Sequence, residues 1–390
     1  MLYKVPEFFL SVSIVSSPLY IFPSGLPQPA DWLMLVFFVA MIVSGSIRHL
    51  PQRGYGLIIS FGLIVVWVAS IQYYWSGLYN SITMLPALYF LYNGLVAVMV
   101  LTLISRKPAV LSLLQKSISI CLVVCLIGLV IEFVAPNFAL VESTKGRVTG
   151  FFNNPNQVGY FSVLGIGALA VIDRFEMTKI TVILAGYASA VLSLFFVVSL
   201  AAFGSAALII VTIMYKNGFT LKRLSRLVVA AILVLSFVFF SNNLTEGWLE
   251  DQFDRRVSVF DRKVSNVEEE RNYARVLAFP EYWLLGAGKG SYERFYPYEG
   301  NEIHSSIADM FFSYGIIGLI LLLSLWYFMI KRANRLDLTV FLAVMLYSAT
   351  HMGLRFTPFW ILLVVIFSIT SLKRCESLNR DATKSKIDMC

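Results

Sequence analysis

The chain has 390 residues, of which 58% are hydrophobic and only 14% are charged, and its mean hydropathy is +0.75. This composition excludes a disordered protein and a small disulfide scaffold, and it favours an all-α polytopic integral membrane protein over a soluble enzyme. The formal net charge of +8 does not indicate a nucleic-acid partner, because the cations fall mostly in short loops between apolar runs.

Apolar runs long enough to cross a bilayer recur along the chain. A membrane-spanning helix needs about 20 predominantly apolar residues. We divide the stretch 178–215 between residues 193 and 199, because a single helix of that length would be too long for a bilayer. The first run lacks a convincing cleavage site and is therefore interpreted as a signal anchor. The twelve predicted spans are 6–23, 31–47, 55–75, 82–104, 117–135, 156–172, 178–195, 198–215, 226–242, 306–330, 336–352 and 357–372.

Charge predicts the orientation of these spans. With the N-terminus in the cytoplasm, Lys and Arg gather in alternate loops, for example at Arg48, Lys107 and Lys331, whereas the opposite loops around 24–30 and 76–81 have none. This positive-inside pattern predicts that both termini are cytoplasmic. The predicted order is nine spans within 1–242, an outer loop over 243–305, three spans within 306–372 and a tail over 373–390.

The outer loop 243–305 is long and rich in aromatic residues, which favours a functional segment over a linker. Apolar residues recur at helical spacing over 246–265, with charges between them. This pattern predicts an amphipathic helix that either lies on the outer membrane-water interface or packs against neighbouring helices.

Histidine and arginine supply the candidate catalytic groups. His304 lies where the outer loop enters a predicted span, and imidazole suits proton transfer near neutral pH, although a structural role is equally open. Arg271 and Arg275 are spaced to share one helix face and could together bind a phosphate or diphosphate. Their alternative partners are the three glutamates that precede them. The histidines have no metal-ligand spacing, so we predict no metal site. We also predict no cofactor.

A second outer segment begins with Arg147 and continues through Asn154, Pro155 and Asn156 into an apolar run. This pattern predicts a capped helix N-terminus, whose free N–H groups and dipole can attract an anion. Capping alone is the other interpretation. The glycine-rich stretch 286–290 fails the phosphate-loop pattern and predicts a turn, in which Lys289 is a further candidate substrate-binding residue.

Three features together resemble the superfamily of O-antigen ligases and Wzy-type polysaccharide polymerases. The first is the segment 147–156, which is similar to the family's Arg-x-x-Gly-x-x-x-Asn-Pro-Asn motif. The second is a single large outer loop that ends in a glycine-rich turn. The third is Glu302-Ile-His-Ser-Ser306 running into a Gly-x-x-Gly helix. One difference is that the stretch 199–205 lacks the Ser-Arg pair of many members, so other arginines must supply its charge.

The resemblance implies a GT-C-like fold of about twelve helices with one large periplasmic loop, in the bacterial inner membrane. It also implies a metal-independent glycosyltransferase that uses an undecaprenyl-diphosphate-linked glycan as donor and a second glycan as acceptor. Chain-length regulator and flippase proteins would be its partners. Under this hypothesis Arg147, Arg271 and Arg275 bind the diphosphate, and His304 activates or orients the acceptor hydroxyl.

The remaining alternatives differ in the acceptor of the glycan or in the class of protein. A polymerase adds the chain to another lipid-linked repeat, whereas a ligase transfers it to lipid A core. The run Phe356-Thr-Pro-Phe-Trp360 somewhat favours a polymerase. A polysaccharide transporter or flippase is a different class, but the halves of the chain show no convincing internal repeat. A non-catalytic scaffold would tolerate loss of His304.

Overall fold

The computed structural model describes residues 4–23, 25–135, 148–173, 178–217, 254–255, 258, 272–299, 302–349 and 351–370. Within these ranges every regular element is a helix, which agrees with the expected all-α class. Six of the described helices are long and apolar enough to cross a membrane: α3 (Gln52–Ser76), α4 (Leu85–Arg106), α5 (Val110–Val134), α6 (Pro155–Ile172), α7 (Ile180–Val197) and α13 (Ser306–Ile330).

Shorter helices account for most of the other predicted runs. Each predicted run except 226–242, which lies outside the described residues, overlaps a described helix. The predicted amphipathic helix over 246–265 also lies outside them, apart from residues 254, 255 and 258. The shorter apolar helices are α1 (Val5–Ser16), α2 (Pro29–Val43), α8 (Leu200–Asn217) and the helix Thr357–Thr370, and the remaining run corresponds to α14 (Arg335–Ser348).

Two helix boundaries differ from the sequence-based expectation, and one agrees. α1 ends at Ser16, well before residue 23, because Pro18 has no backbone N–H to continue the helical hydrogen bonds. α5 begins at Val110, so Lys116 lies on a helix and not in a loop. The predicted division between the seventh and eighth spans is confirmed, since Val198 adopts a left-handed φ of 46° between α7 and α8.

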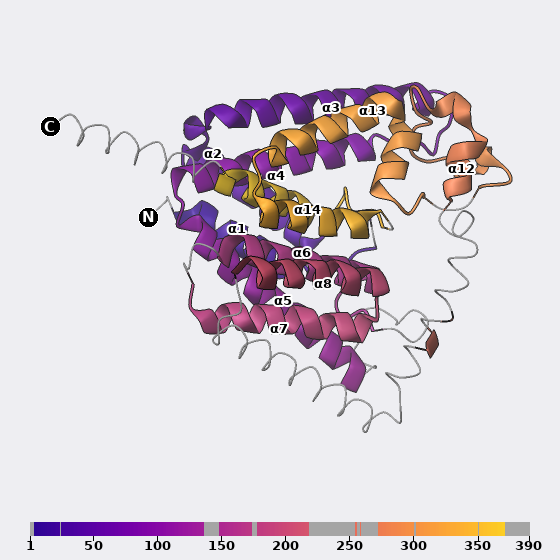
Figure 1. Cartoon of the computed structure of the whole chain (residues 1–390). Helices are drawn as coiled ribbons and strands as arrows, with labels where there is room; N and C mark the ends of the chain where they lie inside the picture. Colours follow the sequence, from indigo (N-terminus) through magenta and orange to yellow (C-terminus); the bar gives the residue numbers. More distant parts are fainter. Residues whose placement is uncertain are drawn as a thin grey trace.

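The helices run roughly parallel to one another, and their connections gather at two ends (Figure 1). At one end Lys107 pairs with Glu7, and Arg106 donates to Ser46. At the other end Tyr20 donates its N–H to Phe151, and Trp75 on α3 donates to Gly286. We call the first the basic end and the second the outer end.

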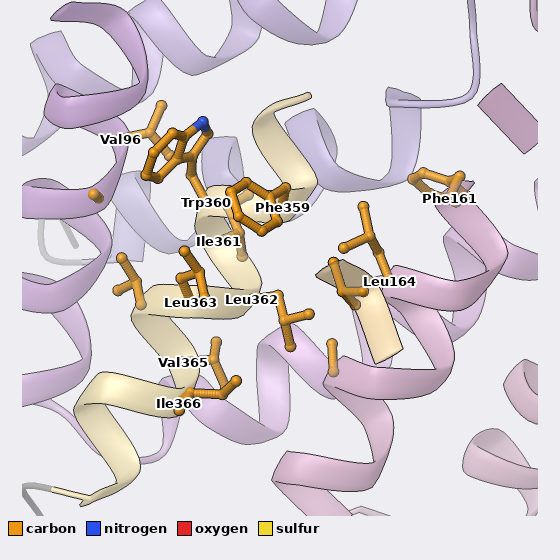
Figure 2. Close-up of a cluster of buried hydrophobic side chains, with 14 of the residues drawn as sticks. Val96, Phe161, Leu164, Phe359, Trp360, Ile361, Leu362, Leu363, Val365 and Ile366 are labelled. Atoms are coloured by element: carbon orange, nitrogen blue, oxygen red, sulfur yellow. The ribbon is translucent and has the colours of Figure 1, made fainter. Parts of the chain in front are cut away.

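The centre of the bundle is formed by α6 and the helix Thr357–Thr370. Almost every residue of α6 is buried, as expected for a helix that is apolar all round and surrounded by others. Figure 2 shows Phe161 and Leu164 of α6 together with Phe359 and Trp360 of the last described helix. Trp360 is fully buried against Phe61 at 5.0 Å between ring centroids, and its indole N–H donates to the Leu354 carbonyl at 2.8 Å. Trp360 therefore packs the last described helix against α3.

α13 contains a break that the sequence did not predict. Gly315 has φ 67° and ψ −175° inside the helix, which leaves carbonyl groups before it without their usual helical donors. The glycine-rich turn supplies replacements: the N–H groups of Ala287 and Gly288 donate to the carbonyls of Phe312 and Ser313 at 2.9 and 2.8 Å. The turn predicted over 286–290 is therefore present, and it docks into the break.

The described part of the outer loop packs onto the same region. α12 (Tyr273–Ala278), η6 (Pro280–Tyr282) and η7 (Tyr292–Phe295) lie beyond the outer end of the bundle, next to α13 (Figure 1). Phe295 and Ile303 of the loop bury themselves against Phe312 of α13. The loop therefore has a small hydrophobic core of its own, anchored on a membrane helix.

We expect Gly286→Ala and Gly315→Ala each to lower the free energy of unfolding by about 2 kcal/mol or more. Both glycines have positive φ, and an added Cβ would collide with the backbone of residues 313–314 or 284–285. Thermal unfolding of the detergent-solubilised protein measures the effect. Gly62→Ala is the matched control, because nothing lies within 4 Å of its added Cβ. Equal melting temperatures for Gly286→Ala and this control would contradict the docking of the glycine-rich turn into the break in α13.

Candidate functional site

A cavity of about 670 Å³ opens at the outer end of the bundle. Its walls come from five parts of the chain that are far apart in sequence: the α1–α2 connection with the start of α2, the first turns of α4, the first turns of α6, residues 302–304, and residues 351–358. Because most of these are helix ends and connections, the cavity has polar groups on several sides.

The structure brings three of the predicted site residues to this cavity. His304, Asn154 and Asn156 all line it, although His304 is 148 positions away from Asn156 in the chain. The predicted helix cap is also present, since the Asn154 side chain accepts from the Asn156 N–H at 2.8 Å. Tyr347 then donates to the Asn156 carbonyl at 2.7 Å, which ties the start of α6 to α14.

Arg275 is not among the residues that line the cavity. It is fully buried in the outer loop, where its guanidinium donates to the carbonyls of Tyr298 and Glu299 at 2.8 and 3.0 Å. The rings of Tyr292 and Phe295 flank it at 5.0 and 5.2 Å. Burial lowers the pKa of Arg275. These contacts give Arg275 a structural role in the loop core.

Arg147 and Arg271 lie outside the described residues, so the predicted pairing of Arg271 with Arg275 is not observed. Lys289 is described, and it stands behind the cavity rather than in its wall. Its Nζ is 2.8 Å from Asp309 and 3.8 Å from Glu302, which does line the cavity. Lys289 therefore affects the cavity indirectly, through its ion pair with the Glu302 carboxylate.

Sequence reasoning did not assign a role to Arg355. Among the described residues that line the cavity, Arg355 is the one with a Lys or Arg side chain. Its guanidinium pairs with Glu302, and its side chain is 30% exposed. A signal was available, because Arg355 follows His351 in a short predicted outer loop. The loop's closeness to residues 302–306 could not be read from spacing.

Glu302 links the two cations. Burial alone would raise the pKa of Glu302, but Lys289 and Arg355 outweigh it and hold that pKa below its ordinary value. Burial alone would lower the pKa of Arg355, but Glu302 outweighs it and raises that pKa above its ordinary value. At neutral pH the cavity therefore contains a charged carboxylate and a charged guanidinium beside His304.

The two serines after His304 have different roles: Ser305 caps α13, and Ser306 joins the start of α13 to residues 351–353. Ser305 caps α13 by accepting from the Ala308 N–H at 3.3 Å. Ser306 donates to the His351 carbonyl at 3.1 Å and accepts from the Gly353 N–H at 2.8 Å. Ser306 of the sequence motif thus joins the two segments that carry His304 and Arg355.

Among the described residues, no group of three His, Cys, Asp or Glu side chains is arranged to hold a metal ion. Comparison of the chain with models of known protein families and with curated protein sequences finds no match.

Acid should weaken the Glu302 ion pairs. Because the folded pKa of Glu302 is lowered, its contribution to stability is complete above the ordinary glutamate pKa of about 4.3 and is lost as the pH falls through the lowered value. We expect the gap in melting temperature between the wild type and Glu302→Gln to be widest near neutral pH and to close in acid. Glu293→Gln, at an exposed position of the same loop, is the control. A gap that does not change with pH would contradict the assignment.

Proposed function

We propose that this protein is a membrane glycosyltransferase that uses a lipid-diphosphate-linked glycan at the outer face of the bacterial inner membrane. The observation that carries the proposal is the outer-end cavity, where His304, Arg355, Asn154 and Asn156 meet. These residues combine a proton acceptor, a cation and a helix N-terminus, which are the groups that transfer from a diphosphate leaving group requires.

Arg355 is assigned to the diphosphate. A guanidinium has five N–H donors, so pairing with Glu302 leaves donors available to phosphate oxygens. The start of α6 adds a positive dipole at the cavity wall. Arg147 and Arg271 remain further candidates for the same anion, and Lys289 supports it indirectly by sharing Glu302.

His304 is assigned to the acceptor. In the proposed reaction an acceptor hydroxyl oxygen bonds to the anomeric carbon of the donor while the bond from that carbon to the phosphate oxygen breaks. The hydroxyl proton passes to the His304 imidazole, and the electron pair leaves with the diphosphate, whose charge Arg355 stabilises. Diphosphate-linked donors need no metal in this scheme.

The proposed topology has about twelve spans with both termini in the cytoplasm. The gathering of Arg48, Arg106, Lys107 and Lys331 on connections at the basic end supports this orientation. Within the proposed class we favour a polymerase of O-antigen or exopolysaccharide repeats over a ligase to lipid A core. A transporter is less well supported, because transporters usually bind their substrate near the membrane midplane and this cavity is built from helix ends.

We expect His304→Ala and His304→Gln to lower transfer by two to four orders of magnitude, since proton transfer by a positioned group typically contributes that much. Membrane insertion should not change, because His304 lies at the cavity wall rather than in the buried core. The measurement is polysaccharide chain length on a gel alongside the amount of inserted protein. Chains of normal length from either variant would remove His304 from the mechanism.

Two substitutions of Arg355 distinguish the effect of its positive charge from the effect of its guanidinium geometry. We expect Arg355→Lys to keep a small part of the activity and Arg355→Gln to lose it, because an ammonium cannot bind phosphate oxygens in a bidentate manner. The readout is the apparent KM for the lipid-linked donor in a reconstituted assay. Arg332→Lys, at an exposed position of the basic end, is the control. An unchanged KM in Arg355→Gln would show that the donor anion binds elsewhere.

A strain that lacks the protein distinguishes polymerase from ligase. Core lipid that carries a single repeat, or lipid-linked single repeats without polymer, would indicate loss of polymerisation. Bare core lipid, with long chains still on the lipid carrier, would indicate loss of ligation. Normal polysaccharide in that strain would overturn the proposed function.

A further inference from the structure

Asp31 is a carboxylate of the cavity that the proposed chemistry does not use. It lies in the first turn of α2 and lines the cavity together with Tyr89 and Tyr92 of α4. One carboxylate oxygen accepts from the Gln28 N–H at 2.8 Å, and the other accepts from the Tyr92 hydroxyl at 2.9 Å. Asp31 is therefore held in place from both sides.

The hydrogen bonds that Asp31 makes within the protein do not occupy all the acceptor positions of its carboxylate. An ionised carboxylate offers about four lone-pair positions, and the hydrogen bonds to Gln28 and Tyr92 use two of them. Asp31 is only partly buried, and its side chain borders the cavity. It can therefore accept further hydrogen bonds from a ligand in the cavity.

Aromatic rings surround this part of the cavity. Tyr20, Trp32 and Tyr89 line it beside Asp31, and Trp32 is 56% exposed. The Tyr89 hydroxyl donates to the Gly25 carbonyl, which fixes its ring between the α1–α2 connection and α4. A ring face carries partial negative charge and attracts C–H groups, which a pyranose presents on its faces.

The part of the cavity that contains Asp31 and the part that contains Arg355 differ in the sign of their charge. The Arg355 guanidinium is 5.8 Å from the centre of the Tyr89 ring, so Tyr89 stands beside both charged groups. The negative charge of Asp31 opposes a diphosphate but favours hydroxyl donors, whereas Arg355 has the reverse preference. One ligand with an anionic end and a hydroxyl-rich end would satisfy both.

We propose that Asp31, Trp32 and Tyr89 form a pyranose-binding subsite, in which Asp31 accepts hydrogen bonds from sugar hydroxyls and the rings contact the sugar face. The subsite rests on the proposed function, because it binds the glycan whose diphosphate or acceptor end lies near Arg355 and His304. It gives the enzyme a means to select the sugar independently of the anion.

Two kinds of small probe, glycosides and pyrophosphate, test the subsite separately from the proposed function. Purified protein in lipid nanodiscs is titrated with methyl β-D-glucopyranoside, methyl β-D-galactopyranoside and methyl α-L-rhamnopyranoside by saturation-transfer NMR, and with inorganic pyrophosphate by calorimetry. We expect at least one glycoside to bind the wild type. Asp31→Asn should weaken that glycoside at least about tenfold, because it loses charge-assisted hydrogen bonds, and should not weaken pyrophosphate binding, because the charge that it removes opposes an anion. Arg355→Gln should show the opposite pattern.

The variants also control for folding. Asparagine can still accept from the Gln28 N–H, so Asp31→Asn keeps the cap of α2. Trp32→Leu alters an exposed ring and should weaken the glycoside as well. Absence of binding by all three glycosides, or equal glycoside affinity in Asp31→Asn and the wild type, would overturn the subsite. Glycoside binding that depends on Asp31, without any pyrophosphate binding to the wild type, would leave the subsite standing and overturn the assignment of the diphosphate.

Discussion

The structure depends on how unpaired backbone carbonyls are satisfied at the break in α13. A helix broken inside an apolar bundle exposes groups that neither lipid nor apolar side chains can pair, and each unpaired group costs several kcal/mol. The carbonyls of Phe312 and Ser313 are paired by Ala287 and Gly288, and the Tyr314 carbonyl accepts from the Trp67 indole of α3 at 2.8 Å. The described part of the outer loop that contains the turn 286–290 is therefore packed into the helix bundle.

The docking of the turn 286–290 into the break in α13 has consequences for the cavity. Gln72 of α3 accepts from the Lys289 N–H at 2.6 Å and donates to the Lys289 carbonyl at 3.2 Å. Lys289 is thereby held where it reaches Asp309 and approaches Glu302, and Glu302 in turn holds Arg355. A chain of hydrogen bonds and ion pairs thus runs from the broken helix to the guanidinium in the cavity. Each member is oriented by the one before it.

The cavity combines groups of opposite preference within one volume. Arg355 and the start of α6 favour an anion, whereas Asp31 and the rings near it favour a neutral, hydroxyl-rich group. The proposed donor, a lipid-linked glycan diphosphate, contains both parts in one molecule.

The helical class, the positions of most helices, the division between residues 193 and 199, the cap at Asn154 and the turn over 286–290 could be predicted from the amino-acid sequence, because these depend on apolar periodicity and on local hydrogen bonds. The same patterns selected His304, Asn154 and Asn156, which share the cavity. The break at Gly315, the contacts of Arg275 in the loop core, and the meeting of Arg355, Glu302 and Asp31 became visible only in the folded chain. Those depend on contacts between segments far apart in the chain, and no local pattern encodes which carbonyl or carboxylate a distant donor will reach.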